Sequence, residues 1–268
     1  MHCCAGCVHS VLSPRCPNVY LAGYSDSWQI FYGKSKTVFK FALEFKNIRI
    51  MKFFLDTANL DQIREAYAMG VLDGVTTNPS LMAKEGIKGK ENQYKHYIDI
   101  CNIVNGDVSA EVIATDYEGM VREGEELAAL NEHIVIKLPC TEAGIKAVKY
   151  FAGKGIKTNC TLVFSLGQAL LAAKAGATYV SPFVGRLDDI SEDGVGLIEE
   201  IVEMYNYYGF GTMVLAASIR HTRHIIDCLK AGADVATCPL PAIKGLLKHP
   251  LTDSGLAKFL EDYHKVNG

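Results

Sequence analysis

The chain has 268 residues, of which 49% are hydrophobic and 21% charged, and its net charge is −3. These values are ordinary for a globular domain, and a charge this close to neutrality gives no electrostatic reason to expect nucleic acid or a membrane surface as a partner. No apolar run approaches the ~18 residues that a membrane-spanning helix needs.

The first 50 residues differ from the rest of the chain. They contain a cluster of zinc-ligand residue types, namely Cys3, Cys4, Cys7, Cys16, His2 and His9. The spacing lacks the two CxxC motifs (CxxC…CxxC) of a typical zinc site, and no apolar segment of a secretory signal follows the start. Because a clean strand pattern begins at Met51, we expect residues 1–50 to lie outside the fold. They are either an extension of the protein or the result of a misassigned translation start. The predicted domain covers residues 51–268.

From residue 51 onward, short apolar runs alternate with amphipathic stretches. The predicted strands cover residues 52–56, 73–77, 108–113, 133–138, 156–160, 178–182, 212–216 and 234–238. The predicted helices cover residues 60–69, 91–104, 117–130, 141–152, 165–175, 196–207 and 220–231. Asn59, Thr141 and Ser165 are typical helix N-caps, and glycines such as Gly176 end several of these helices just before a strand.

This strict alternation of strands and helices predicts a parallel sheet. Eight units fit an α/β fold of the (β/α)8 TIM-barrel type, which takes ~250 residues and can be as small as ~200. A doubly wound open sheet is the alternative, but it usually has fewer strands, and no Gly-rich dinucleotide fingerprint follows the first strand. An extra C-terminal helix over residues 252–265 has no strand left to cover. It is expected to close the barrel or to contact a neighbouring subunit.

Lys137 lies in the apolar run His133–Pro139 (HIVIKLP), which reads as a buried parallel strand. A charged and unpaired lysine on such a strand costs several kcal/mol. The side chain can avoid this cost by reaching water or by losing its proton, and a neutral amine is a nucleophile suited to Schiff-base formation. A lone lysine of this kind more often reaches water, so its assignment depends on the other strands.

In a TIM barrel the active site forms where the strands end. Seven of the eight predicted strands carry polar residues there: Asp56, Thr76, Thr77, Asn78, Glu111, Lys137, Asn159, Thr161, Ser181 and Ser218. Each alone could cap a helix or start a turn, but together they indicate an active site. Asp56 and Glu111 suit general acid–base catalysis, while Asn78 and Asn159 can bind several hydroxyl groups, as a sugar requires.

Two arginines directly follow the sixth and seventh predicted strands. Arg186 comes after Ser181, and Arg220 comes after Ser218, where a helix is expected to begin. Alone, each arginine is more readily an ordinary surface ion-pair partner. Two guanidinium groups near a helix N-terminus suit a phosphate dianion, and this is the usual phosphate region of a barrel.

No metal site is expected at the rim. His221 and His224 lack a third ligand and are interpreted as surface or interface residues. Five further cysteines are scattered singly among apolar elements: Cys101, Cys140, Cys160, Cys228 and Cys238. They are typical of buried free thiols in a reducing compartment, so the sequence predicts a cytoplasmic protein.

The rim residues occur in runs that resemble one known family. The runs are Phe54–Thr57 (FLDT), Gly74–Ser80 (GVTTNPS), Ile136–Pro139 (IKLP), Asn159–Thr161 (NCT), Ser181–Arg186 (SPFVGR) and Ala217–Arg220 (ASIR). In this order and on these strands they resemble the small transaldolases and the similar fructose-6-phosphate aldolases, from residue 51 to about residue 265. Residues 1–50 have no counterpart in the resemblance.

The resemblance implies a class I aldol mechanism on sugar phosphates, without metal or cofactor. Lys137 would form a Schiff base with the C2 carbonyl of a ketose, and Asp56 would take the proton from the C4 hydroxyl as the C3–C4 bond breaks. A water held by Glu111 and Thr161 would shuttle protons. The remaining implied contacts are Thr76, Asn78, Asn159, Ser181 and Phe183 for the sugar and Arg186, Ser218 and Arg220 for the phosphate. The family also implies a homo-oligomer, a pentamer or a decamer.

Two positions distinguish the activities within this family. Where fructose-6-phosphate aldolases carry Gln and Tyr, this chain has Glu111 and Phe183, as transaldolases do. Phe183 offers no hydroxyl to position a water that would protonate the bound enamine, so transfer of the three-carbon unit is favoured over its release. The alternatives are an aldolase that releases free dihydroxyacetone and a non-catalytic sugar-phosphate-binding barrel. A non-catalytic barrel would be expected to lack some of the catalytic residues, yet Lys137, Asp56 and Glu111 are all present.

Overall fold

The computed structural model describes residues 19–24, 27–32, 35–41 and 50–268. The chain divides into two compact units, Met1–Arg49 and Ile50–Gly268. The first unit contains an antiparallel sheet in the order β1 (Val19–Tyr24), β2 (Ser27–Tyr32) and β3 (Ser35–Phe41), which the sequence analysis did not predict. The cysteine and histidine cluster at residues 2–16 lies outside the described residues.

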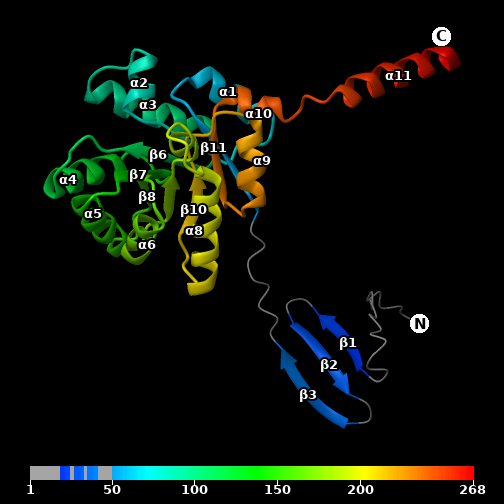
Figure 1. Ribbon diagram of the computed structural model, residues 1–268, viewed down its shortest axis with the longest axis horizontal. Coiled ribbons are helices and arrows are strands. Elements are labelled where there is room, and N and C mark those ends of the chain that lie inside the picture. The colour runs from blue at the N-terminus through cyan, green and yellow to red at the C-terminus, as the bar shows by residue number, and fades with distance from the viewer. Residues whose placement is uncertain (1–18, 25–26, 33–34, 42–49) are drawn as a thin grey trace, which may run out of the picture. The chain divides into compact units, whose positions relative to one another are not determined.

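The second unit is a closed barrel of eight parallel strands (Figure 1). Its strands are β4 (Lys52–Asp56), β5 (Gly74–Thr76), β6 (Asp107–Glu111), β7 (Ile134–Pro139), β8 (Thr158–Val163), β9 (Tyr179–Pro182), β10 (Met213–Ala216) and β11 (Val235–Cys238). They pair in chain order, and β11 closes the ring by pairing with β4 through Val235↔Lys52 to Cys238↔Leu55. The predicted (β/α)8 fold is confirmed.

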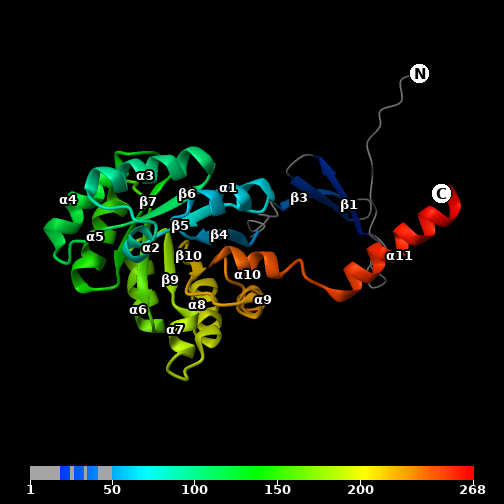
Figure 2. The same cartoon turned by 90° about the horizontal axis from the view of Figure 1, so that it is seen from above.

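Helices alternate with the strands and surround them, as the two views in Figures 1 and 2 show. The longer ones are α1 (Leu60–Ala68), α3 (Lys90–Ile103), α4 (Tyr117–Ala128), α5 (Glu142–Gly153), α6 (Leu166–Ala175), α8 (Gly194–Tyr208) and α9 (Thr222–Lys230). The predicted N-caps are confirmed, because the side chains of Asn59, Thr141 and Ser165 accept backbone hydrogen bonds from the first turns of α1, α5 and α6. Gly176 ends α6 at φ +94°, a conformation that glycine adopts without steric cost.

Three short helices were not predicted: α2 (Pro79–Lys84), α7 (Val184–Asp188) and α10 (Leu240–Gly245). Each follows a barrel strand directly, and so helps to form the rim. The expected helix start at Arg220 is wrong, because α9 begins at Thr222 with His221 as its N-cap. Arg220 therefore lies in the loop that precedes the helix.

The core has two layers. The larger one lies between the strands and the helices, and a smaller cluster made by Phe54, Val135, Tyr179, Leu215, Ala217 and Val235 fills the inside of the barrel. Phe54 and Tyr179 meet across it with ring centroids 5.8 Å apart. Side chains alternate along a strand, so a residue two positions after an inner one also faces inward. Asp56, Lys137, Ser181 and Thr237 stand in this relation to the inner cluster, which places them above it at the strand ends.

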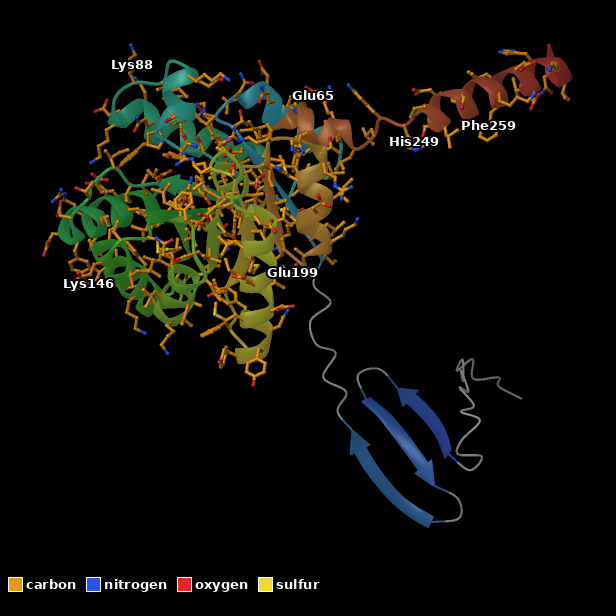
Figure 3. All side chains as sticks on the ribbon, in the orientation of Figure 1. Glu65, Lys88, Lys146, Glu199, His249 and Phe259 are labelled. Atoms are coloured by element: carbon orange, nitrogen blue, oxygen red, sulfur yellow. The ribbon has the colours of Figure 1, made fainter. Side chains whose placement is uncertain are left out.

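The final helix, α11 (Pro250–Asn267), has no buried residue. Figures 1 and 2 draw it apart from the other helices of its unit. Phe259 is 74% exposed, and its side chain projects from α11 without a neighbouring element in Figure 3. Among the described residues, no helix combines the length and apolar character needed to cross a membrane.

The five cysteines of the barrel unit are all free. Cys101, Cys160, Cys228 and Cys238 are buried, as expected, and Cys140 is half-buried. No group of His, Cys, Asp and Glu residues in the described part of the chain has the arrangement of a metal site.

Candidate active site

Lys137 lies at the centre of the barrel mouth, on the inner face of β7. Its side chain is only 7% exposed, and its Nζ is 3.0 Å from Oε2 of Glu111 and 3.3 Å from the backbone oxygen of Thr77. Glu111 comes from β6 at the same level, because the two residues are register partners. The buried amine therefore has a carboxylate within proton-transfer distance, which is the environment that a nucleophilic lysine needs.

Asp56 approaches the same point from β4. Its Oδ1 accepts a hydrogen bond from Thr76 Oγ1 at 2.8 Å, and these residues are register partners on adjacent strands. Burial raises the pKa of Asp56, the positive charge of Lys137 and the Thr76 hydrogen bond lower it, and the negative charge of Glu111 raises it. Burial is the largest of these effects. A buried carboxyl group at a strand end, with its pKa raised in this way, is a candidate for proton transfer in a reaction.

A second row of polar groups runs through β6, β8 and β9. Ser181 donates from Oγ to Oδ1 of Asn159 at 2.7 Å, and Asn159 donates from Nδ2 to Oγ of Ser109 at 3.2 Å. All three are buried. The amide of Asn159 is therefore held by its neighbours, and Ser181 is the member of this row that lines the open cavity.

The two arginines occupy different positions. Arg186, on α7, stacks over the ring of Phe183 at 4.7 Å, and both line the cavity. Arg220 donates instead from Nη2 to Oδ2 of Asp189 at 2.6 Å, and both side chains of this pair are about half exposed. Arg186 is thus the guanidinium directly beside the cavity.

The loop after β10 approaches the start of α7 closely. Gly185 donates a backbone hydrogen bond to the oxygen of Ser218 at 3.1 Å, and a Cβ atom at Gly185 would lie 2.4 Å from that oxygen. Ser218 itself has φ +59°, the left-handed region that costs energy for a residue with a side chain. Backbone strain of this kind often occurs at ligand-binding sites, and here it is on a residue that lines the cavity.

Nine of the twelve residues predicted for the site line one cavity. They are Asp56, Thr76, Asn78, Lys137, Thr161, Ser181, Phe183, Arg186 and Ser218. Glu111, Asn159 and Arg220 do not line it. Glu111 pairs with Lys137, Asn159 accepts a hydrogen bond from Ser181, and Arg220 lies two residues after Ser218. The structure thus brings together side chains from β4, β5, β7, β8, β9 and the segments that follow β5, β9 and β10.

Thr237 also lines the cavity, although it was not predicted to; it comes from β11, the one strand to which no polar rim residue was assigned. The signal was present, because Thr237 stands two residues after the inward-facing Val235 and so faces inward. Thr77 was noted only as one of several rim residues. Its backbone oxygen accepts a hydrogen bond from Lys137, a contact that no side-chain pattern could indicate.

Comparison with known proteins gives a consistent result. Residues 53–268 match the family model described as "Transaldolase/Fructose-6-phosphate aldolase". The chain is 80% identical over 218 residues to a "Probable transaldolase" of Bacteroides thetaiotaomicron and 79% identical over 217 residues to one of Bacteroides fragilis; each alignment covers 81% of this chain and all of the relative. A relative with the same description in Cytophaga hutchinsonii is 70% identical over 218 residues, again 81% of this chain and all of the relative.

A solved structure, the thiamine phosphate pyrophosphorylase from Pyrococcus furiosus, is similar with a TM-score of 0.51 and 18% identity. The similarity covers 70% of this chain and 85% of that one. At this identity the likeness concerns the fold alone. The family match and the high identity to curated relatives, by contrast, agree with the residues gathered at the barrel mouth. The chain therefore belongs to the transaldolase/fructose-6-phosphate aldolase family of enzymes.

Proposed function

We propose that this enzyme is a transaldolase that moves a dihydroxyacetone unit between sugar phosphates through a Schiff base on Lys137. The reaction would convert sedoheptulose 7-phosphate and glyceraldehyde 3-phosphate into erythrose 4-phosphate and fructose 6-phosphate. The observation that carries the proposal is the buried Lys137 amine, 3.0 Å from a carboxylate and facing a cavity that Asp56 also lines.

The first half of the reaction uses these groups in turn. Lys137 first gives a proton to Glu111, 3.0 Å away, and the free amine then attacks the C2 carbonyl of the donor ketose; loss of water gives the Schiff base. Glu111 is close enough to Nζ to move the protons of this step, and Thr161 offers a buried hydroxyl without a hydrogen-bond partner in the described residues. Asp56 then takes the C4 hydroxyl proton, the C3–C4 bond breaks, and an aldehyde leaves while the three-carbon enamine stays on Lys137.

The second half reverses these steps on a different aldehyde. The enamine carbon attacks the acceptor carbonyl, Asp56 returns its proton to the new hydroxyl, and hydrolysis of the Schiff base frees the product. Asn78 caps α2 by accepting from the backbone N–H of Leu81, and this holds its side chain on the wall of the cavity that Asp56 and Ser181 also line. We propose that Asn78 and Ser181 orient the hydroxyl groups of the sugar, with Asn159 holding Ser181.

The phosphate is proposed to bind Arg186 and Ser218, with Arg220 nearby. Arg186 needs no rearrangement to meet a ligand in the cavity, because it already lies against Phe183 there. Arg220 would have to share its guanidinium with Asp189 or release it. We therefore assign the larger part of phosphate affinity to Arg186.

The second candidate is a fructose-6-phosphate aldolase, which would release free dihydroxyacetone. Residue identity speaks against it, because the cavity presents the Phe183 ring and no phenol hydroxyl there, and Glu111 stands where these aldolases carry Gln. A non-catalytic sugar-phosphate-binding barrel is a third candidate, and the pairing of Lys137 with Glu111 speaks against it.

One assay separates the three candidates. Fructose 6-phosphate is offered with and without erythrose 4-phosphate, and both sedoheptulose 7-phosphate and free dihydroxyacetone are measured. A transaldolase forms the seven-carbon product only when the acceptor is present and releases little dihydroxyacetone without it. Rapid release without acceptor would identify an aldolase, and binding without any turnover would identify a non-catalytic barrel.

We also propose that α11 contacts a second copy of the chain in a homo-oligomer. Six apolar side chains of this helix are more than half exposed: Leu251, Leu256, Phe259, Leu260, Tyr263 and Val266. A helix with this much uncovered apolar area and no buried residue would be stabilised by packing against a partner. Light scattering of the Phe259→Glu variant checks the proposal, since its assembly should be smaller than that of the unsubstituted protein.

A further inference from the structure

Thr237 completes a row of three polar groups across the barrel mouth. Its Oγ1 lies 2.5 Å from Oγ1 of Thr76, and Thr76 Oγ1 lies 2.8 Å from Oδ1 of Asp56. Asp56 lies on β4, and Thr237 and Thr76 lie on the two strands that flank it, β11 and β5. Thr76 and Thr237 are 2% and 3% exposed, so bulk water does not replace either hydrogen bond.

The hydroxyl protons available in this row determine which group donates each hydrogen bond. An ionised carboxylate only accepts hydrogen bonds, so the single hydroxyl proton of Thr76 is directed at Asp56. Thr76 then has only lone pairs to offer Thr237, and Thr237 must be the donor between them. A hydroxyl that accepts one hydrogen bond becomes a better donor of the next, which strengthens the contact with the carboxylate.

We propose that Thr237 is a positioning residue for the aldol reaction, which orients the Thr76 hydroxyl toward Asp56 and so favours the ionised, base form of this carboxyl group. The proposal rests on the proposed function, in which Asp56 takes the proton of the C4 hydroxyl. Thr237 touches neither the transferred proton nor Lys137 in this scheme. It acts on Asp56 through Thr76.

The surroundings of Asp56 determine the sign of the effect. The titratable and charged side chains that act on Asp56 or share its cavity come from four elements: Lys137 of β7, Glu111 of β6, Cys238 of β11 and Arg186 of α7. Burial raises the pKa of Asp56, while the Lys137 charge and the Thr76 hydrogen bond lower it. Weakening the Thr76 hydrogen bond removes part of the lowering effect. Loss of the Thr237 hydroxyl therefore moves the pKa of Asp56 upward, and less of the base form is present at low pH.

The test is the pH dependence of kcat/KM for three-carbon transfer from fructose 6-phosphate to erythrose 4-phosphate. Thr237→Val keeps the shape of the side chain but removes the donor, and it should move the acid limb upward by about half a pH unit or more. Thr237→Ser restores the hydroxyl and should return the limb to its original place. An acid limb that stays unchanged in a folded Thr237→Val enzyme would overturn the proposal, because the hydroxyl would then serve packing only.

A matched control is available in Thr158. This residue is also a fully buried threonine of a barrel strand, and its hydroxyl has no hydrogen-bond partner among the described residues. Thr158→Val should leave the acid limb where it is. An equal shift in this control would show that any loss of a buried hydroxyl disturbs the profile, which contradicts a specific role for Thr237.

The double variant tests the route of the effect. Without the Thr76 hydroxyl, Thr237 has nothing through which to act on Asp56, so Thr76→Val with Thr237→Val should shift the limb no further than Thr76→Val alone. An additional shift would overturn the proposal. If Thr237→Val does not fold, Thr237→Ala removes the same hydroxyl without adding a methyl group, and the same profile decides.

Borohydride trapping of the sugar on Lys137 separates this proposal from the proposed function. Trapping should proceed in the unsubstituted enzyme and in Thr237→Val alike, because Schiff-base formation does not use Asp56. Absence of trapping in the unsubstituted enzyme would contradict the proposed function itself. Normal trapping and transfer with an unmoved acid limb in Thr237→Val would contradict the role of Thr237 alone.

Discussion

The two ends of β6 carry lysine–carboxylate pairs that look alike and differ in their surroundings. At the C-terminal end, Glu111 is 3.0 Å from Lys137, whose side chain is 7% exposed. At the N-terminal end, Asp107 is 2.7 Å from Lys157, whose side chain is 46% exposed, and Asp107 also accepts a hydrogen bond from the Tyr179 hydroxyl. The distances alone would make the two lysines equivalent. Their difference in burial, and the cavity beside Lys137, make only one of them a candidate nucleophile.

A similar contrast separates Asp73 and Asp234 from Asp56. At the N-terminal end, Asp73 and Asp234 accept hydrogen bonds from the backbone N–H groups of Phe53 and Val214, both at 2.8 Å, and so join neighbouring strands. At the opposite end, Asp56 accepts from a threonine side chain and faces the cavity. Carboxylates bound to backbone hold the fold, whereas those bound to side chains at the rim can change partners during a reaction.

The largest expected effect comes from replacing Lys137, with the replacement of Lys157 as its matched control. Lys137→Met should reduce three-carbon transfer to the uncatalysed level, because no other described side chain in the cavity can form a Schiff base. Lys157→Met should transfer at a near-normal rate. The measurement is the rate of sedoheptulose 7-phosphate formation, with mass spectrometry of the borohydride-reduced adduct. Trapping of the three-carbon fragment on Lys157 in the unsubstituted enzyme would contradict the assignment.

Asp56→Asn should have the next largest effect. The amide cannot take the C4 hydroxyl proton, and loss of one general acid–base group commonly lowers the rate by about 10²–10⁴-fold. The Schiff base on Lys137 should still form, because its formation does not use Asp56. Transfer rate and borohydride trapping are measured on the same sample. Failure of both would mean that Asp56 is needed to hold the site together, and not for proton transfer alone.

Arg186→Ala should mainly affect affinity. Removing a guanidinium that binds phosphate costs roughly 1.5–3 kcal/mol, which is about tenfold or more in the KM of a phosphorylated sugar. Arg220→Ala should cost less, because its guanidinium is already paired with Asp189. Unphosphorylated dihydroxyacetone should be nearly unaffected as a donor in either variant. An equal loss for phosphorylated and unphosphorylated donors would place these arginines outside the phosphate site.

Phe183→Tyr should change the fate of the enamine by a few-fold. The new hydroxyl, placed on a ring that already lines the cavity beside Arg186, can hold a water near the enamine carbon and so speed its protonation. Release of free dihydroxyacetone should then rise relative to transfer, as measured from fructose 6-phosphate with and without erythrose 4-phosphate. An unchanged ratio in an active variant would leave Glu111 as the residue that decides between the two reactions.

Much of the barrel could be predicted from the sequence. All eight strands follow from buried apolar runs, and the caps at Asn59, Thr141 and Ser165 marked their helices correctly. The short helices α2, α7 and α10 could not be predicted from periodicity, because five or six residues do not complete an amphipathic pattern. The α7 helix depends instead on a distant contact, since Val184 donates to the backbone oxygen of Ala217.

The rim was predicted less completely than the strands. The positions of the predicted strand ends indicated which side chains could meet. They did not indicate which of these side chains face the cavity, because that depends on the pairing register of neighbouring strands. Thus Asn159 proves to be held by Ser181 and Ser109, and Arg220 by Asp189. The alternation of side chains along a strand would have placed Thr237 on the inner face. It was overlooked because a single threonine within Val235–Cys238 resembles an ordinary strand residue.

The smallest expected effect returns to the N-terminal pair. Lys157→Met removes an ion pair whose lysine is nearly half exposed, and such pairs commonly contribute about 0–1 kcal/mol to the free energy of unfolding. Asp107 keeps the hydrogen bond from Tyr179, so it is not left buried without a partner. Chemical denaturation of this variant should therefore show a loss below about 1 kcal/mol, and the loss should shrink at high salt because the pair is open to screening. A loss of several kcal/mol that is insensitive to salt would mean that this pair behaves as a buried one. Exposure of the lysine would then no longer explain why the two ends of β6 differ.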